Sequence, residues 1–158
     1  MFGIDDTTLF ESWPVMCYYN NDKQRNNALY NWYVVFDDRG VCPANWHVPS
    51  PDEYTELIEF LGGMEKASMK LKSTASWKIN GTNSSGFNAL GIGCRIGSGE
   101  FAYKNENSGF WTDAIEDMSG EYDHSFLGRC LILSSETTET EIRGNTFNVG
   151  NAVRCIKN

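Results

Sequence analysis

The stretch VCPANWHVPSPDEYTELIEFLGG, residues 41–63, decides the fold of the first half of the chain. It carries three signals of a helix start: Ser50 as the N-cap, Pro51 at the first helical position, and Glu53 completing a Ser-x-x-Glu capping box. Apolar side chains then recur at helical spacing, and this stripe consists of Tyr54, Leu57, Ile58 and Leu61. The pattern predicts a helix over residues 51–61 that ends at Gly62-Gly63, because glycine readily adopts left-handed backbone angles.

The rest of the chain divides into a short helical part and a long part rich in turns. Residues 29–36 are apolar on both faces, which is typical of a strand covered on both sides. Residues 64–71 predict a second helix with Met64, Ala67 and Leu71 on one side. Beyond Ser73 we expect short strands over residues 88–95, 101–103, 110–113, 126–134, 140–143 and 152–156, with a hairpin turn at residues 97–99. Helices followed by turn-rich strands indicate an α+β fold.

Several motifs resemble the Fibrobacter succinogenes major paralogous domain family. They are YNWYVV at 30–35, residues 40–63, KLK at 70–72, Trp77, TNSSGFNAL at 82–90, Arg95, GFW at 109–111 and AVRC at 152–155. The resemblance covers residues 17–158 as a single domain, whereas residues 1–16 match least and are expected to be an arm or a diverged first strand. It implies a C-type-lectin-like fold with two helices packed on a small, twisted, mainly antiparallel sheet, and long loops in the C-terminal half. The same fold carries the variable proteins of diversity-generating retroelements.

Five cysteines leave at least one thiol unpaired within the chain. In the lectin-like arrangement, Cys42 before the helix and Cys155 in the last strand would lie close together. Cys94 and Cys130 form a second candidate pair. The alternative is that all five are small buried apolar side chains in a reducing compartment. No pair has Cys-x-x-Cys spacing, so a zinc ribbon or thioredoxin-like chemistry is not expected.

Composition and charge exclude several partners. The formal net charge of −8 disfavours nucleic acid and anionic membrane surfaces. No apolar run approaches the roughly 20 residues that span a bilayer, so we expect no membrane insertion. The first residues, MFGIDD, do not resemble a signal peptide. We expect an extracellular, cell-surface or virion location, and a protein or glycan ligand as partner, with an oligomer as an open alternative.

Catalytic and metal-binding patterns are absent from the sequence. His47 and Cys42 are close in sequence, but spacing alone does not provide the positioned base that a nucleophilic thiol needs. The preferred interpretation is structural, with Trp46 in the core and His47 hydrogen-bonded locally. The chain lacks the Glu-Pro-Asn, Gln-Pro-Asp and Trp-Asn-Asp motifs of calcium-dependent lectins, and it lacks EF-hand spacing. We therefore expect no enzyme activity, no cofactor and no metal site.

The candidate recognition surface lies within residues 109–150, where aromatic side chains alternate with short polar ones. Such mixtures provide flat contact area with little rotamer entropy, together with hydrogen bonding. The candidate ligand-binding residues are Trp111, Asp113, Tyr122, Asp123, His124, Phe126, Asn145 and Asn148, and the alternative for Trp111 is a place in the core. The family resemblance, together with the absence of catalytic patterns, implies a non-enzymatic adhesin or receptor-binding domain, with variable loops if it is retroelement-diversified. The second hypothesis is a structural subunit of a virion or surface assembly, such as a fibre tip or decoration protein.

Overall fold

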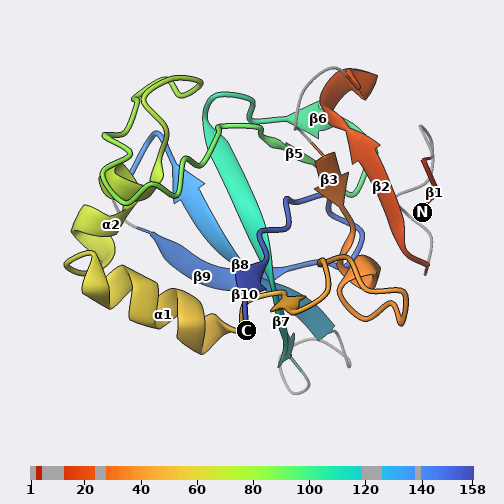
Figure 1. Ribbon diagram of the computed structural model, residues 1–158. Coiled ribbons are helices and arrows are strands. Elements are labelled where there is room, and N and C mark those ends of the chain that lie inside the picture. The colour runs from red at the N-terminus through yellow and green to blue at the C-terminus, as the bar shows by residue number, and fades with distance from the viewer. Residues whose placement is uncertain (1–2, 5–12, 24–27, 119–125, 138–139) are drawn as a thin grey trace.

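The computed structural model describes residues 3–4, 13–23, 28–118, 126–137 and 140–158. In Figure 1 the two helices lie on one side, a sheet built from the N-terminal strands lies on the other, and a three-stranded sheet passes between them. The chain is therefore α+β, as predicted. Its strands form four small sheets rather than one, and the largest of them have three strands.

The first half contains short strands and both helices. Strands β1 (Gly3–Ile4), β2 (Val15–Tyr18) and β3 (Ala28–Tyr30) form one sheet, in which β1 and β2 are parallel and β2 and β3 are antiparallel. Two 3-10 turns, η1 (Tyr19–Asn21) and η2 (Trp32–Val34), follow β2 and β3. Strand β4 (Trp46–His47) precedes the helices α1 (Pro51–Phe60) and α2 (Met64–Leu71).

The second half is formed by strands. The hairpin of β5 (Cys94–Arg95) and β6 (Phe101–Ala102) turns at the predicted glycines, where the Gly99 amide donates to Ile96 O at 2.9 Å. Strands β7 (Asn107–Asp117), β8 (Phe126–Ser134) and β9 (Glu141–Asn145) form the central antiparallel sheet. The last strand, β10 (Ile156–Lys157), pairs with β4 and not with its neighbours in sequence.

Both predicted helices are confirmed. The capping box forms as expected, since the Glu53 amide donates to Ser50 Oγ at 3.2 Å and the Ser50 amide donates to Glu53 Oε2 at 2.8 Å. Helix α1 ends at Gly62 and Gly63, which have positive φ. In α2, Ala67 and Leu71 are buried as predicted, but Met64 is 57% exposed, so its assignment to the buried side was wrong.

The predicted strand over residues 29–36 was wrong beyond Tyr30. The reason is Asn31, whose buried side chain accepts the Val15 amide at 3.1 Å and donates to Trp13 O at 2.9 Å. These two hydrogen bonds fix Asn31 against the backbone of Trp13 and Val15, and the chain then turns into η2. Trp32 then stacks on Phe147 with ring centroids 4.6 Å apart. The apolar residues on both faces reflect this 3-10 turn rather than a covered strand.

Three other strand predictions were wrong in extent. Over residues 88–95 only Cys94–Arg95 is a strand, because residues 88–93 make only isolated bridges at Ala89 and Gly93 and are interrupted by positive φ at Asn88 and Gly93. Strand β7 is longer than the predicted 110–113 and carries a bulge between Trp111 and Ile115. At the C-terminus, residues 152–156 contribute only the first residue of β10. The predicted strand 126–134 matches β8.

One segment near the C-terminus, Gly150–Ala152, joins three of the sheets. Gly150 exchanges two backbone hydrogen bonds with Arg95, and Asn151 exchanges two with Tyr30. Ala152 donates to Gly109 O at 2.8 Å and accepts from the Trp111 amide at 3.0 Å. The segment thus ties β3, β5 and β7 together, and the packing of the domain depends on it.

The main core lies between α1, α2, β2, β3 and β8. Its members are largely or wholly buried, and each large side chain contributes about 1.5–3 kcal/mol. They include Val15, Leu29, Tyr54, Ile58, Leu71, Leu131 and Leu133. A second cluster on the other side of β8 contains Trp32, Trp111, Cys130 and Ile132.

The disulfide Cys42–Cys155 is present, as expected, and it links the start of the β4 segment to the residue before β10. The second expected pair, Cys94–Cys130, was wrong, because neither cysteine takes part in a disulfide. The Cys130 thiol instead faces β9, where it donates to Arg143 O and accepts from Asn145 Nδ2, each at 3.5 Å. Burial raises the pKa of Cys94 to about 11 and that of Cys130 to about 12, so both are protonated at neutral pH.

Breaking the disulfide is expected to destabilise the domain strongly. It closes a loop with a sequence separation of 113 residues, for which chain-entropy arguments give about 2–5 kcal/mol. We expect urea unfolding with reductant, or of a Cys42→Ser variant, to show this loss relative to the oxidised protein. The Cys94→Ser variant is the control, and it should keep the sensitivity to reductant. Equal midpoints with and without reductant would contradict the assignment.

Candidate ligand-binding groove

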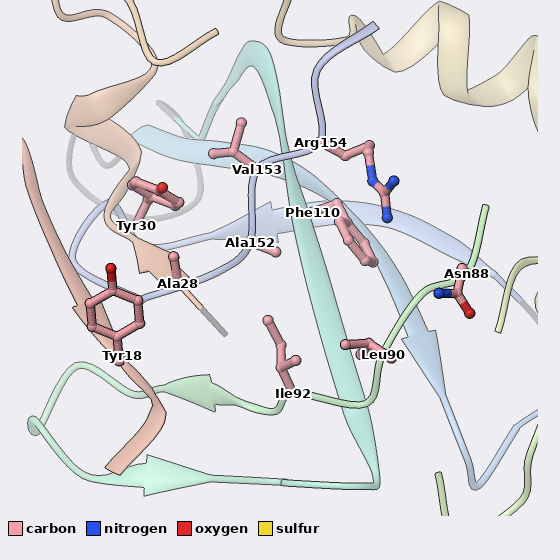
Figure 2. Close-up of a pocket in the computed structure, with 10 residues that line it drawn as sticks. All are labelled: Tyr18, Ala28, Tyr30, Asn88, Leu90, Ile92, Phe110, Ala152, Val153 and Arg154. Atoms are coloured by element: carbon pink, nitrogen blue, oxygen red, sulfur yellow. The ribbon is translucent and has the colours of Figure 1, made fainter. Parts of the chain in front are cut away.

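A groove of about 490 Å³ opens between β3 and residues 88–92 (Figure 2). This volume lies within the range of small-ligand sites, roughly 300–1,000 Å³. Its lining combines aromatic rings, aliphatic side chains, one carboxamide and one guanidinium. The ten lining residues are Tyr18, Ala28, Tyr30, Asn88, Leu90, Ile92, Phe110, Ala152, Val153 and Arg154.

One wall is a single face of the β2–β3 ribbon. Tyr18 and Ala28 are register partners, and Tyr30 lies two residues further along β3, so all three point to the same side. The intervening residues, Cys17 and Leu29, point the other way and are fully buried in the core. The alternation of strand residues therefore presents two tyrosine rings to the groove while anchoring the ribbon behind it.

The opposite wall uses the same alternation without a regular strand. Asn88, Leu90 and Ile92 line the groove, whereas Ala89 between them is fully buried. Ala89 holds the segment in place, since its amide donates to Leu71 O at 2.9 Å and its carbonyl accepts from the Ser73 amide at 2.8 Å. The end of α2 thus positions this wall.

The back and rim of the groove come from β7 and the chain end. Phe110 is 5% exposed and packs edge-on against Phe87, with ring centroids 5.4 Å apart. The Arg154 guanidinium lies 4.6 Å from the centre of the Phe87 ring and donates to Phe87 O at 3.0 Å. Figure 2 shows this side chain directed down toward Phe110 from the C-terminal segment. The cation is thereby held at one end of an aromatic surface.

The chemistry of the lining suits binding. Its ten residues include no carboxylate, histidine, cysteine or serine, and its polar groups are two phenols, one carboxamide and one guanidinium. Burial, and to a smaller extent the charge of Tyr18, raises the pKa of the Tyr30 hydroxyl. The hydroxyl therefore stays protonated at neutral pH. The groove thus offers stacking surfaces, neutral hydrogen-bonding groups and one positive charge.

Trp111, a predicted ligand-binding residue, belongs to the core instead. Its side chain is fully buried, and its indole N–H donates to Tyr30 O at 2.7 Å. It has no surface with which to contact a ligand, which corrects the binding assignment in favour of the core alternative. The bond helps to hold β7 against β3 behind the groove.

The other described candidates are dispersed. Asp113 is exposed beside Val48 and His47. Phe126 is 46% exposed at the start of β8. Asn145 is half-buried beside Cys130. Asn148 accepts from Thr146 Oγ1 at 2.7 Å. None of these residues lines the groove. Tyr122, Asp123 and His124 lie outside the described residues.

His47 is hydrogen-bonded locally, but the expected core position of Trp46 was wrong. Trp46 is 43% exposed on the short β4 strand. The two ring nitrogens of His47 face Asn158 Oδ1 at 2.6 Å and Glu53 Oε1 at 2.9 Å. His47 therefore ties the chain end to the helix N-terminus, on the same side as the disulfide.

The groove could have been suspected from the sequence at only two points. Tyr18 and Tyr30 are aromatic residues alternating with apolar ones, a weak signal of a half-exposed strand face. Asn88 and Arg154 lie within the GFNAL and AVRC motifs, but nothing in one chain shows that these motifs meet. Their proximity arises from pairings between distant segments.

A family model described as the Fibrobacter succinogenes major domain matches residues 5–157. The chain belongs to this family. The match includes most of residues 1–16, the segment that carries the fewest of the family's motifs. No curated protein and no solved structure is similar enough to the chain to count as a match.

Among the described residues, no group of three or more histidine, cysteine, aspartate or glutamate side chains is arranged to hold a metal ion. Within the same part of the chain, no helix has the length and apolarity to cross a bilayer.

The His47 tether predicts a loss of stability as pH rises. Hydrogen bonding to Asn158, and then to Glu53, raises the pKa of His47 above its ordinary 6.5, because both ring nitrogens must carry protons to donate to oxygen. Its contribution is fully present below the ordinary pKa and is lost as pH rises through the folded value. The pKa of Glu53 is lowered, chiefly by the Ser50 amide, so its contribution is present above 4.5 and is lost on acidification below that.

We expect the urea midpoint of the protein to fall between about pH 6 and pH 8 by more than that of a His47→Gln variant. The His124→Gln variant keeps His47 and should follow the unmodified protein. Parallel pH profiles for all three proteins would show that the tether does not titrate in this range.

Proposed function

We propose that this chain is a non-enzymatic ligand-binding domain that acts outside the cell and recognises a glycan or a protein segment. The groove between β3 and residues 88–92 is the observation that carries the proposal. A concave surface with rings on one wall, a guanidinium at the rim and a carboxamide opposite can hold a ligand by stacking and hydrogen bonds without a metal.

The disulfide supports an extracellular location. Structural disulfides persist in oxidising compartments and are rare in the cytosol, and Cys42–Cys155 closes most of the chain into a loop. The family resemblance leads us to propose further that the α+β arrangement is a C-type-lectin-like fold. Retroelement diversification, if present, would vary residues 109–150 rather than most of the groove.

An assembly subunit is the second candidate function, and exposed apolar residues favour it. Phe36, Ile115 and Phe126 are 62%, 45% and 46% exposed. Ile115 is the register partner of Gly128. The Trp32 indole lies so close to Gly128 that any Cβ there would overlap it. The Trp32 ring in turn contacts the Phe36 ring, with ring centroids 4.2 Å apart. Apolar side chains that gather on one surface can mark subunit contacts. A stable oligomer by light scattering would favour this function, and a monomer would favour the binding domain.

Groove substitutions should abolish ligand recognition while leaving the fold intact. The purified chain would be screened against immobilised glycans and a displayed peptide library, and its best ligand titrated by calorimetry. We expect Tyr18→Ala and Arg154→Ala each to weaken binding by about 1–2 kcal/mol, roughly tenfold, because they remove a stacking surface and the charge at the rim.

Phe60→Ala is the matched control, since Phe60 is 85% exposed on α1 and does not line the groove. It should bind like the unmodified protein. Circular dichroism would verify that all variants fold. Unchanged affinity in both groove variants would refute the assignment of the groove.

A further inference from the structure

A second pocket, of about 230 Å³, adjoins the groove between α1 and the chain end that leads into β10. Residues of α1 form one side of this apolar pocket, and residues 154–156 form another. Arg154 lines both the groove and the apolar pocket. A ligand that contacts Arg154 can therefore extend into both.

Most of the lining of the apolar pocket is hydrocarbon. Its apolar members are Pro49, Leu57, Phe87, Cys155 and Ile156. The Cys155 sulfur is bonded in the disulfide, so it offers neither a thiol nor a charge. Leu57 is half-buried and Ile156 is 39% exposed, so a ligand can reach both. Such a surface favours an aliphatic or aromatic side chain over a sugar ring, because the sugar hydroxyls would lose their hydrogen bonds to water there.

Two of the three polar side chains in the lining are not open to a ligand. One Glu53 carboxylate oxygen accepts from the Ser50 amide at 2.8 Å, and the other lies 2.9 Å from His47 Nε2. The Tyr54 hydroxyl is buried and does not reach the surface of the pocket. Charge recognition in the apolar pocket therefore falls to Arg154.

Arg154 is held in place but keeps donors for a ligand. Its guanidinium lies 4.6 Å from the centre of the Phe87 ring, and one N–H donates to Phe87 O at 3.0 Å. Within the described part of the chain it forms no ion pair. A guanidinium has five N–H donors and binds a carboxylate through two parallel hydrogen bonds. The formal net charge of −8 repels polyanions, so a ligand with a single negative charge is favoured.

The closeness of the charge to the apolar pocket selects the end of a peptide chain. Arg154 lines the apolar pocket itself, so the anion and the apolar group of a ligand must be neighbours. In an extended peptide, adjacent side chains point to opposite sides, so an acidic residue next to an apolar one is directed away from it. A C-terminal residue instead carries its carboxylate and its side chain on the same Cα. It can place the carboxylate on Arg154 and the side chain in the apolar pocket.

We propose that Arg154 and the apolar pocket bind the C-terminal residue of a peptide or protein ligand, one with a free carboxylate and a large aliphatic or aromatic side chain. Figure 2 shows Arg154 above Phe110, on the side away from Tyr18 and Tyr30. The preceding residues of the ligand therefore run back along the groove toward the two tyrosines. The inference rests on the proposed function and narrows its ligand from a glycan or protein segment to a protein C-terminus.

The test compares peptides that differ only at the C-terminus. The purified full chain would be titrated by calorimetry with the acetylated peptide Ala-Tyr-Ala-Leu, once as the free acid and once as the C-terminal amide. We expect the acid to bind about tenfold more tightly, because the amide loses the charge-assisted hydrogen bonds to Arg154. The same peptide ending in serine should bind about tenfold more weakly than the leucine peptide, because it leaves the apolar pocket empty.

Two variants connect these preferences to residues. Arg154→Gln should bind the acid and the amide equally, at the affinity of the amide. Ile156→Ala should bind the leucine acid about three- to fivefold more weakly and lose part of the preference for leucine over serine. Arg143→Gln and Ile79→Ala are the matched controls, since both residues are exposed and neither lines the groove or the apolar pocket. They should bind every peptide like the unmodified protein.

Several outcomes would overturn the inference. They are equal affinity for the acid and the amide, a preference for the acid that survives in Arg154→Gln, and tighter binding of glucuronic acid, a sugar carboxylate, than of the leucine peptide. A lack of saturable binding of the acid peptide up to about 1 mM would also overturn it.

Failure of this inference is distinguishable from failure of the proposed function. If a glycan or an internal peptide from the screen binds and is weakened by Tyr18→Ala, while acid and amide ends bind alike, only the C-terminal specificity fails. If binding of the acid peptide depends on Arg154 and Ile156 but not on Tyr18, the C-terminal specificity stands and the assignment of the groove fails.

Discussion

The backbone pairing of Gly150–Ala152 is the constraint on which the rest of the structure depends. Three consecutive residues bond to β3, β5 and β7, which are otherwise parts of separate sheets. The sheet of β5 and β6 is too small to be stable alone, because two short strands bury little apolar surface. Joining them through one segment lets them share the core beneath the helices. The disulfide and the β4–β10 pair then hold the chain beyond this segment in place.

The same segment helps to form the groove. Ala152 lines the groove. Neighbouring residues of an extended chain direct their side chains to opposite sides, and the adjacent strand repeats this with Gly109 and Phe110.

Two buried polar side chains hold distant parts of the chain together. Asn31 and Lys72 have protein partners. The Asn31 side chain hydrogen-bonds to the backbone of Trp13 and of Val15, where β2 begins. Lys72 Nζ donates to Ser134 O at 3.0 Å. Burial lowers the pKa of Lys72, which marks the cost of placing an amine there. These groups fix the chain path.

The sequence by itself determined the elements whose causes are local. The Ser50–Glu53 capping box, the glycines after α1, the hairpin at residues 97–99 and the apolar run of β8 each act within a few residues, so their spacing predicts them. Tertiary structure alone decided the rest. The strand expected after Tyr30 gave way to a turn because Asn31 bonds to a segment 16 residues earlier. Cys130 remains a thiol because its strand turns it toward β9. The groove brings Tyr18, Asn88 and Arg154 together across most of the chain, through hydrogen bonds between segments whose proximity no local pattern encodes.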